Sequence, residues 1–344
     1  MANITFTESS GLNDSIFGKS QAPIRSFILK RAEAFEEKSL IPFLFAQEKS
    51  THWAEKYGSM TSMDGFHAVG ENGAVPTDGF QEGYSQTISN KTWKNSFSIS
   101  REIMEDSKVF DLRKKPQAFI DGYYRTREEI SARIFAEAIN NVSTSAGVTE
   151  FTQDAEKFSI LGADGVRLFH KSHPSKVKGA VQSNWFADAL SPAALAAAET
   201  AMQNFRDDND KVLNVAPNTL LIPNEYSMKK AAFEIVGSEA DPTSGNAGSN
   251  AFNYLFGRWR VIVWPYLNKY LTAGIKPWVL IASEVNEDNG GAIFQDRTGL
   301  DVNSFIDTNT HANVWTGYAR FSLGFNDWRF AAVGGMAGGT QLVS

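Results

Sequence analysis

One apolar repeat, between Lys115 and Asn141, constrains the fold more than any other part of this 344-residue sequence. Apolar side chains recur there at the three- and four-residue spacing of an amphipathic helix. Pro116 stands where a first helical turn tolerates proline. A helix over residues 116–141 would run roughly 40 Å, whereas the mean helix of a globular protein has about 11–12 residues. We therefore predict a single long helix that serves as a strut for the rest of the chain.

A glycine-rich acidic segment, residues 57–90, is the second unusual feature. It holds six glycines, and no Lys or Arg lies between Lys56 and Lys91. Such long insertions are uncommon in compact domains and are usually functional or disordered. Its flanks, residues 85–90 and 93–100, have the alternation typical of strands. We predict a two-stranded flap; because an isolated hairpin is marginal in water, it needs another surface to lie on. The alternative is a flexible solvent loop.

The other elements are predicted from local patterns. Apolar spacing predicts a helix from Pro23 to Ser39 that Pro42 ends, with a strand at residues 43–46. Ser191 and Pro192 are typical of a helix start, and Asn224 is the expected cap of a later helix. Strands are expected at residues 158–162, 166–169, 218–222, 259–264, 278–282, 300–306, 314–325 and 328–333, and a polar loop at residues 237–250.

Composition excludes several classes of protein. The chain has no cysteine, which rules out disulfides, thiolate metal sites and a cysteine nucleophile. A formal net charge of −6 does not favour nucleic-acid binding as a specific function. The N-terminus has no basic or apolar region typical of a signal peptide, and no apolar run reaches the ~18 residues of a membrane span. We expect a protein that is soluble where it is made.

Catalytic motifs are missing from the sequence. There is no GxSxG, no GxxxxGK and no GxGxxG after a strand. His170 and His173, in HKSHP, form the one histidine pair that suggests a metal, but their spacing before a proline is poor ligand geometry. We expect no enzyme, no cofactor and no metal. A metal-dependent hydrolase that uses His170 and His173 is one alternative, and a fibre or decoration protein is another.

The order of these parts resembles the major capsid proteins of tailed bacteriophages with the Hong Kong-97-type fold, and most closely the Mu-type major head subunit family. The flap, the long helix and several short segments carry the resemblance. These segments are FSISREIMED (97–106), GVRLFHKSHPS (165–175), PAALAAAETAMQNFRDD (192–208), NTLLIPNEY (218–226) and NDWRF (326–330).

The resemblance implies an α+β fold with an N-terminal arm, an extended β-hairpin loop, a peripheral domain with a long spine helix, and an α/β axial domain. In this sequence the implied parts are an arm (1–20), an N-terminal helix and strand (21–56), the flap (57–92), the peripheral domain (93–185) with its spine helix (116–141), the axial domain (186–290), and return strands to the peripheral domain (291–344).

The resemblance also implies a structural function. The subunit would assemble with copies of itself into hexamers and pentamers of an icosahedral shell. Its other implied partners are a portal, a separate scaffolding protein and packaged double-stranded DNA, which it would bind non-specifically; no membrane is involved. Its location would be the virion, and the host cytoplasm during assembly.

Charge and aromatic residues suggest how neighbouring subunits meet. We expect flap carboxylates to pair with basic side chains near the long helix of a neighbour, each exposed pair contributing about 0–1 kcal/mol. Flap aromatics would supply apolar anchors. The acidic candidates are Asp64, Glu71, Asp78 and Glu82, the aromatic ones are Phe66, Phe80 and Tyr84, and the basic ones are Arg113, Lys114, Arg125, Arg127 and Arg133.

Overall fold

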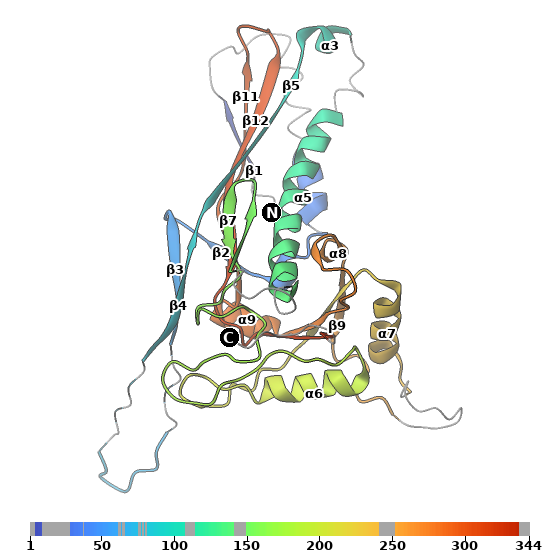
Figure 1. Ribbon diagram of the computed structural model, residues 1–344. Coiled ribbons are helices and arrows are strands. Elements are labelled where there is room, and N and C mark those ends of the chain that lie inside the picture. The colour runs from blue at the N-terminus through green and yellow to red at the C-terminus, as the bar shows by residue number, and fades with distance from the viewer. Residues whose placement is uncertain are drawn as a thin grey trace.

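The computed structural model describes residues 4–8, 28–36, 38–60, 63, 66–74, 77, 79, 81–106, 114–140, 149–240 and 252–336. Figure 1 shows an elongated molecule: a long twisted sheet and the long helix α5 lie side by side, and a smaller sheet with its helices forms the opposite end. A hairpin leaves the body beside the long sheet. Asp64, Asp78, Phe80 and Arg113 lie outside the described residues, as do most of the expected arm and of the loop at residues 237–250.

The long helix is present. α5 runs from Lys114 to Asn140, 27 residues, so its ends differ from the expected 116–141 by one or two residues. Its apolar face is buried over almost its whole length, from Phe119 and Ile120 to Ile134, Phe135 and Ile139. Two clusters of buried side chains include residues of α5, one near each end. The helix therefore links the two parts of the hydrophobic core.

The first sheet has the strand order β1 (Ile4–Glu8), β11 (Ala292–Ile306), β12 (Asn313–Phe325), β5 (Lys91–Ile99), and β2 (Ala46–Lys49) also pairs with β11. β11, β12 and β5 are antiparallel, whereas β1 and β2 run parallel to β11. One face packs on α5 through aromatic rings. The Phe97 and Trp315 rings stack 5.0 Å apart, and the Phe119 ring lies 5.2 Å from Phe97.

The second sheet has the order β13 (Ala331–Gly334), β10 (Trp278–Ile281), β8 (Thr219–Pro223), β9 (Arg260–Trp264). The helices in the same part of the chain are α6 (Pro192–Gln203), α7 (Tyr226–Gly237), α8 (Leu267–Tyr270) and α9 (Ser283–Asn289). Ser191 caps α6 as predicted, since its hydroxyl accepts a hydrogen bond from the Ala194 N–H at 3.2 Å. This sheet contains strands from both sides of α9 in the sequence: β10 precedes α9, and β13, which pairs antiparallel with β10, follows it. The last strand therefore joins the second sheet, whereas β11 and β12 lie in the first.

Three local predictions were wrong. Pro42 does not end a helix but lies in the first turn of the short helix α2 (Ile41–Leu44), where its missing N–H costs nothing. The strand after it is β2, which begins at Ala46 rather than at residue 43. Glu225, not Asn224, is the N-cap residue of α7.

The segment after α5 is less regular than predicted. It forms the hairpin β6 (Glu150–Gln153) and β7 (Glu156–Ser159). Residues 160–190 contribute only isolated bridges such as Leu161–Arg167, within the part of the chain that the structure describes. Their order comes from side chains that bond to distant backbone groups, such as Asn184 to Leu168 and Ala331. Such contacts leave no periodic signal in the sequence.

The flap has two paired strands at its base. β3 (Ala54–Met60) and β4 (Glu82–Ser89) are antiparallel. The second expected flank, residues 93–100, is not a strand of the flap, because β5 follows β4 directly and pairs with β12 of the long sheet. α3 (Arg101–Asp106) begins after Ser100, whose hydroxyl accepts a hydrogen bond from the Ile103 N–H at 3.4 Å, at the far end of the long sheet (Figure 1). Among the described residues, no helix combines the length and the apolar character needed to cross a bilayer.

Candidate assembly surfaces

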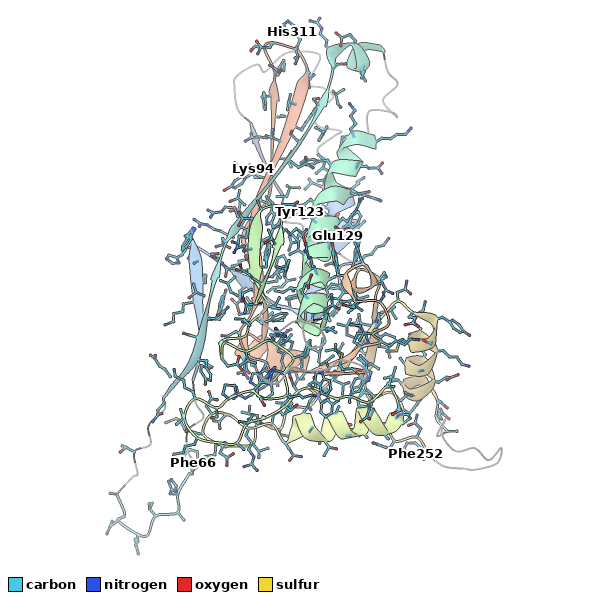
Figure 2. All side chains as sticks on the ribbon, viewed as in Figure 1. Phe66, Lys94, Tyr123, Glu129, Phe252 and His311 are labelled. Carbon is cyan, nitrogen blue, oxygen red and sulfur yellow. The ribbon has the colours of Figure 1, made fainter. Side chains whose placement is uncertain are left out.

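The flap reaches away from the body of the molecule. Figure 2 places Phe66 on this projection, and its side chain is fully exposed. Glu71 and Glu82 are exposed as well, whereas Tyr84 is half-buried at the base of the flap. Among the described acidic and aromatic candidates of the flap, only Tyr84 is therefore partly buried.

The base of the flap is held by one lysine of the chain that follows β7. Lys176 Nζ donates a hydrogen bond to the Gly83 carbonyl at 2.6 Å, and it lies 5.7 Å from the centre of the Tyr84 ring. Burial is the main cause that raises the pKa of the Tyr84 hydroxyl. Tyr84 is therefore partly covered by its own chain, and its role as an anchor stays a prediction.

Two of the basic candidates on α5 are engaged inside the chain. Arg127 donates a hydrogen bond to the Tyr123 hydroxyl at 3.0 Å and lies 3.6 Å from Asp296, with its guanidinium 4.6 Å from the Phe294 ring centre. Arg133 donates to Gln153 at 3.2 Å and lies 4.7 Å from the Phe151 ring centre. The periodic pattern places both on the polar face of α5, but β11 and the β6–β7 hairpin cover that face. Arg125 and Lys114 keep exposed side chains.

The histidine pair has structural contacts. His173 is buried, with Nδ1 at 2.7 Å from Asp164 Oδ2 and Nε2 at 3.2 Å from Asn184 Oδ1. Its ring stacks on Trp328 at 4.1 Å. Both ring nitrogens of His173 therefore face acceptors inside the protein, which leaves neither of them for a metal. No group of three or more His, Cys, Asp or Glu side chains that could hold a metal occurs among the described residues.

The turn between β2 and β3 is densely hydrogen-bonded. Glu55 Oε1 accepts hydrogen bonds from the Ser50 hydroxyl at 2.9 Å, the Thr51 N–H at 3.0 Å and the His52 N–H at 3.1 Å. The His52 carbonyl accepts from Asn90 Nδ2 at 2.8 Å and from Arg297 at 2.9 Å. The Asn90 N–H donates to the Trp53 carbonyl at 3.0 Å. Residues 50–55 are thus fixed to Asn90, between β4 and β5, and to Arg297 of β11, and we call them the flap-root turn.

The flap-root turn gives a pH prediction. Hydrogen bonds from the His52 N–H, the Ser50 hydroxyl and the Thr51 N–H lower the pKa of Glu55 to about 2 from 4.5. A lowered pKa means that Glu55 stabilises the fold fully above pH 4.5, and that this stabilisation is lost as the pH falls towards 2. We expect urea unfolding to show wild type more stable than Glu55→Gln at pH 6, with the difference shrinking steadily below pH 4.5. A difference that does not change with pH would contradict this assignment.

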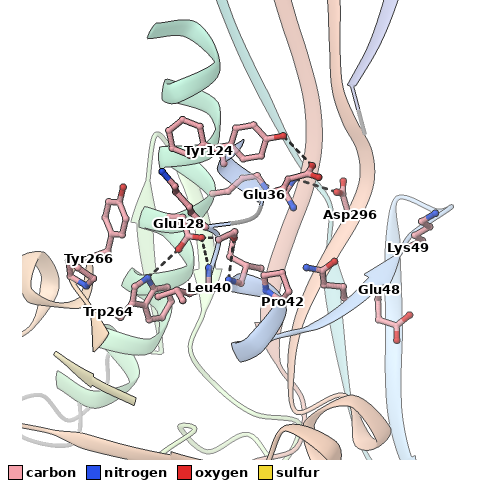
Figure 3. Close-up of a pocket in the computed structure, with 17 residues that line it drawn as sticks. Glu36, Leu40, Pro42, Glu48, Lys49, Tyr124, Glu128, Trp264, Tyr266 and Asp296 are labelled. Carbon is pink, nitrogen blue, oxygen red and sulfur yellow. Dashed lines mark hydrogen bonds and ion pairs between the residues drawn. The ribbon is translucent and has the colours of Figure 1, made fainter. Parts of the chain in front are cut away.

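A cleft of about 650 Å³ lies between residues 35–42, α5 and the β9–α8 junction (Figure 3). Glu128 forms one wall: its carboxylate accepts hydrogen bonds from the Ser39 hydroxyl at 2.6 Å, the Leu40 N–H at 3.1 Å and Trp264 Nε1 at 3.2 Å. Glu36 accepts from the Tyr124 hydroxyl at 3.2 Å. Apolar lining comes from Ile41, Pro42, Pro265 and Tyr266, among others. The cleft therefore combines apolar walls with several carboxylates.

Comparisons with known proteins bear on these surfaces. A family model described as "Phage capsid protein" matches residues 83–334. The comparison with curated proteins gives no match. A solved chain from Mycobacterium phage Patience is similar with a TM-score of 0.50 and 12% identity, over 99% of this chain and 95% of that chain. This similarity shows a shared fold.

Two further solved structures are similar at lower scores. One, from Microbacterium phage Oxtober96, has a TM-score of 0.47 and 10% identity over 86% of this chain and 90% of that chain. The other, described as "Capsid of native GTA particle computed with C5 symmetry", has a TM-score of 0.49 and 11% identity over 86% and 89% of the two chains.

Proposed function

The chain belongs to the phage capsid protein family, and from this premise we propose how its surfaces build a shell. It is a major capsid subunit with a Hong Kong-97-like fold, a structural component of the virion that associates with copies of itself. The narrower assignment to the Mu-type major head subunit family stays a prediction, because the matching family is described only as phage capsid protein.

We propose that copies of the subunit form hexamers and pentamers, with each flap lying on an adjacent copy. The observation that carries this proposal is the flap itself: Phe66, Glu71 and Glu82 are exposed on a projection that its own chain leaves uncovered. Arg125 and Lys114 on α5 are the described basic residues that fit the flap carboxylates. Arg127 and Arg133 fit this role less well, because their side chains are largely buried.

The domain roles follow the same proposal. Residues 186–290, with β8, β9, β10, α6 and α7, would be the axial domain that meets its copies around the ring centre. Residues 93–185, with α5 and β5, would be the peripheral domain, to which β11 and β12 return. Residues 1–20 would be the arm and residues 57–92 the flap. The parallel pairing of β1 with β11 supports an arm that reaches the long sheet.

Other partners are proposed on chemical grounds. With a net charge of −6, the subunit would contact packaged double-stranded DNA weakly and without sequence preference. A portal and a separate scaffolding protein would assist assembly in the host cytoplasm. The hydrolase alternative has no support in the site geometry, since His173 is bound on both ring nitrogens. The family match favours a shell subunit over a fibre or decoration protein.

Electron microscopy of the expressed protein tests this function, alone and with candidate scaffolding protein from the same genome. Closed shells, or rings of five and six subunits, are the expected products. Monodisperse monomers under all of these conditions would contradict the proposal. Metal analysis of the same preparation would test the hydrolase alternative, because that alternative requires a bound metal ion.

Reversal of the flap charges should block assembly without unfolding the subunit. We expect Glu71→Lys with Asp78→Lys to lower the yield of shells by about tenfold or more. Each exposed pair contributes only about 0–1 kcal/mol, but two pairs are lost and replaced by repulsion, and about 1.4 kcal/mol in total corresponds to a factor of ten. Sedimentation separates shells from free subunits, and circular dichroism checks the fold. Glu71 is exposed, so the subunit's own stability should change little.

A matched control removes the effect of net charge. Glu287 and Asp288 are exposed on α9, and their double change to lysine alters the net charge by the same amount. That variant should assemble normally. Adding Arg125→Glu and Lys114→Glu to the flap variant should restore part of the yield. Normal shells from the flap variant would refute the pairing.

A further inference from the structure

An exposed tryptophan lies on the flap-root turn. The side chain of Trp53 is 71% exposed, and His52 beside it is also exposed. The turn lies between β2 and β3, near the upper end of β3 at the edge of the molecule (Figure 1). Single exposed apolar residues are common and carry no meaning by themselves. The distinguishing feature here is the rigidity of the backbone that presents the indole.

That rigidity depends on buried and distant groups. The Asn90 side chain is buried and donates hydrogen bonds to the Ser50 hydroxyl at 2.7 Å and the His52 carbonyl at 2.8 Å. The Ser50 N–H donates to the Asp296 carbonyl of β11 at 3.1 Å. A side chain held in place before binding loses little conformational entropy on association. Tryptophan is also the residue type most enriched among those that dominate interface energies.

The cleft of Figure 3 has the chemistry to receive such a side chain. Pro42, Pro265 and Tyr266 offer apolar surface. Glu36, Glu48 and Asp296 add carboxylates to the lining. Lys38, Lys49 and Arg127 line the cleft as well. An indole combines an apolar body with one N–H donor, which suits a cleft where apolar walls stand beside carboxylates such as Glu36 and Glu48.

The cleft does not receive Trp53 of its own chain, whose indole lies in solvent. Gln47, Glu48 and Lys49, just before the flap-root turn, line the same cleft. Every copy therefore carries both the exposed indole of Trp53 and the cleft with its carboxylates. Two such complementary surfaces on one subunit are what a contact between identical subunits needs.

We propose that Trp53 of one subunit inserts into the cleft between residues 35–42, α5 and the β9–α8 junction of a second copy. This contact rests on the proposed self-assembly, and it is separate from the flap pairs because it uses the root of the flap and not its tip. It gives each subunit a fixed anchor beside its projecting arm.

Photo-crosslinking in assembled shells tests the contact. Trp53 is replaced by p-benzoylphenylalanine, and shells are formed from a mixture of ¹⁵N-labelled and unlabelled subunits. Mixed-isotope crosslinks from position 53 to residues 35–49 or 264–266 are the expected result. Crosslinks to any other region, or only within one chain, would overturn the proposal, and so would crosslinks to another protein.

Variants give a second measurement. Trp53→Ala should raise the subunit concentration needed for assembly by about thirtyfold, the factor that corresponds to truncation of a dominant interface residue. Trp53→Phe should lie between this variant and wild type. Glu55→Gln loosens the turn without touching the indole, so we expect a smaller increase. The unfolding midpoint of Trp53→Ala should stay near wild type, because the side chain is exposed.

The outcomes separate the two proposals. If wild type forms shells and Trp53→Ala assembles at the same subunit concentration as wild type, the Trp53 contact is refuted and the shell function stands. Absence of wild-type shells under all conditions would refute both. Val181→Ala, another exposed apolar residue, is the control for a general effect of surface apolar area.

Discussion

Replacement of Arg329 by methionine should lower the free energy of unfolding by about 3–5 kcal/mol, the cost of leaving buried charges without their partner. Arg329 Nη2 lies 2.9 Å from Asp208 and Nη1 lies 3.2 Å from Asp327. Its Nε donates to the Arg206 carbonyl at 2.8 Å, and all three charged side chains are at most 9% exposed. Methionine keeps much of the volume but leaves two carboxylates buried and unpaired.

Urea unfolding of the unassembled subunit measures this effect. The matched control is Lys230→Met, because Lys230 also pairs with a carboxylate, Glu234, but these two side chains are 58% and 55% exposed. Its loss should cost about 0–1 kcal/mol. Equal losses for the two variants would contradict the view that burial decides the energy of these pairs. Asp208→Asn with Asp327→Asn, added to Arg329→Met, should recover part of the loss.

Replacement of Gly317 by valine should disrupt the packing between the long helix and the sheet. A Cβ atom on Gly317 would lie 2.4 Å from Phe119 Cζ and 3.1 Å from Leu300 Cδ1, closer than packed atoms come. Phe119 is itself buried and lies beside Phe97, so its ring has little room to move. Overpacking of this kind costs about 1–3 kcal/mol, occasionally more.

The neighbouring residue gives the control for that change. Thr316 lies next to Gly317 on β12, and its side chain points to the other face of the sheet because side chains alternate along a strand. Thr316→Val should change the unfolding midpoint little, while Gly317→Val lowers it clearly. A similar loss for both would mean that β12 is sensitive to any valine, and not that Gly317 permits the close approach of α5.

Features with a local cause could be predicted from the sequence. The long helix follows from apolar spacing over 27 residues, a signal that few alternative structures share. Ser191 caps α6 because its hydroxyl needs only the following three residues. Pro42 misled the prediction because a proline that ends one helix and a proline that begins another look alike in sequence.

Features with a distant cause could not be predicted. Arg127 and Arg133 repeat at positions typical of a solvated face, but they are covered by β11 and by the β6–β7 hairpin, which come from elsewhere in the chain. The flap-root turn depends on Asn90 and Arg297, far from Ser50 in sequence. The rigid, exposed presentation of Trp53 is therefore visible only in the structure.

The flap as a projection was predictable from composition, whereas its direction was not. Six glycines and a run without Lys or Arg indicate a segment that cannot bury itself. Where it leaves the body depends on the pairing of β3 with β4 and on the Lys176 contact with Gly83. Both contacts are set by the fold of the whole subunit.

Electron cryomicroscopy of particles formed by the wild-type chain tests the central claim most directly. We predict a closed icosahedral shell, in which density for the flap of each subunit lies over an adjacent copy, near Arg125 of α5. Particles in which each flap folds back onto its own subunit would contradict the assembly mechanism. A preparation that contains only monomers, with scaffolding protein present, would contradict the function itself.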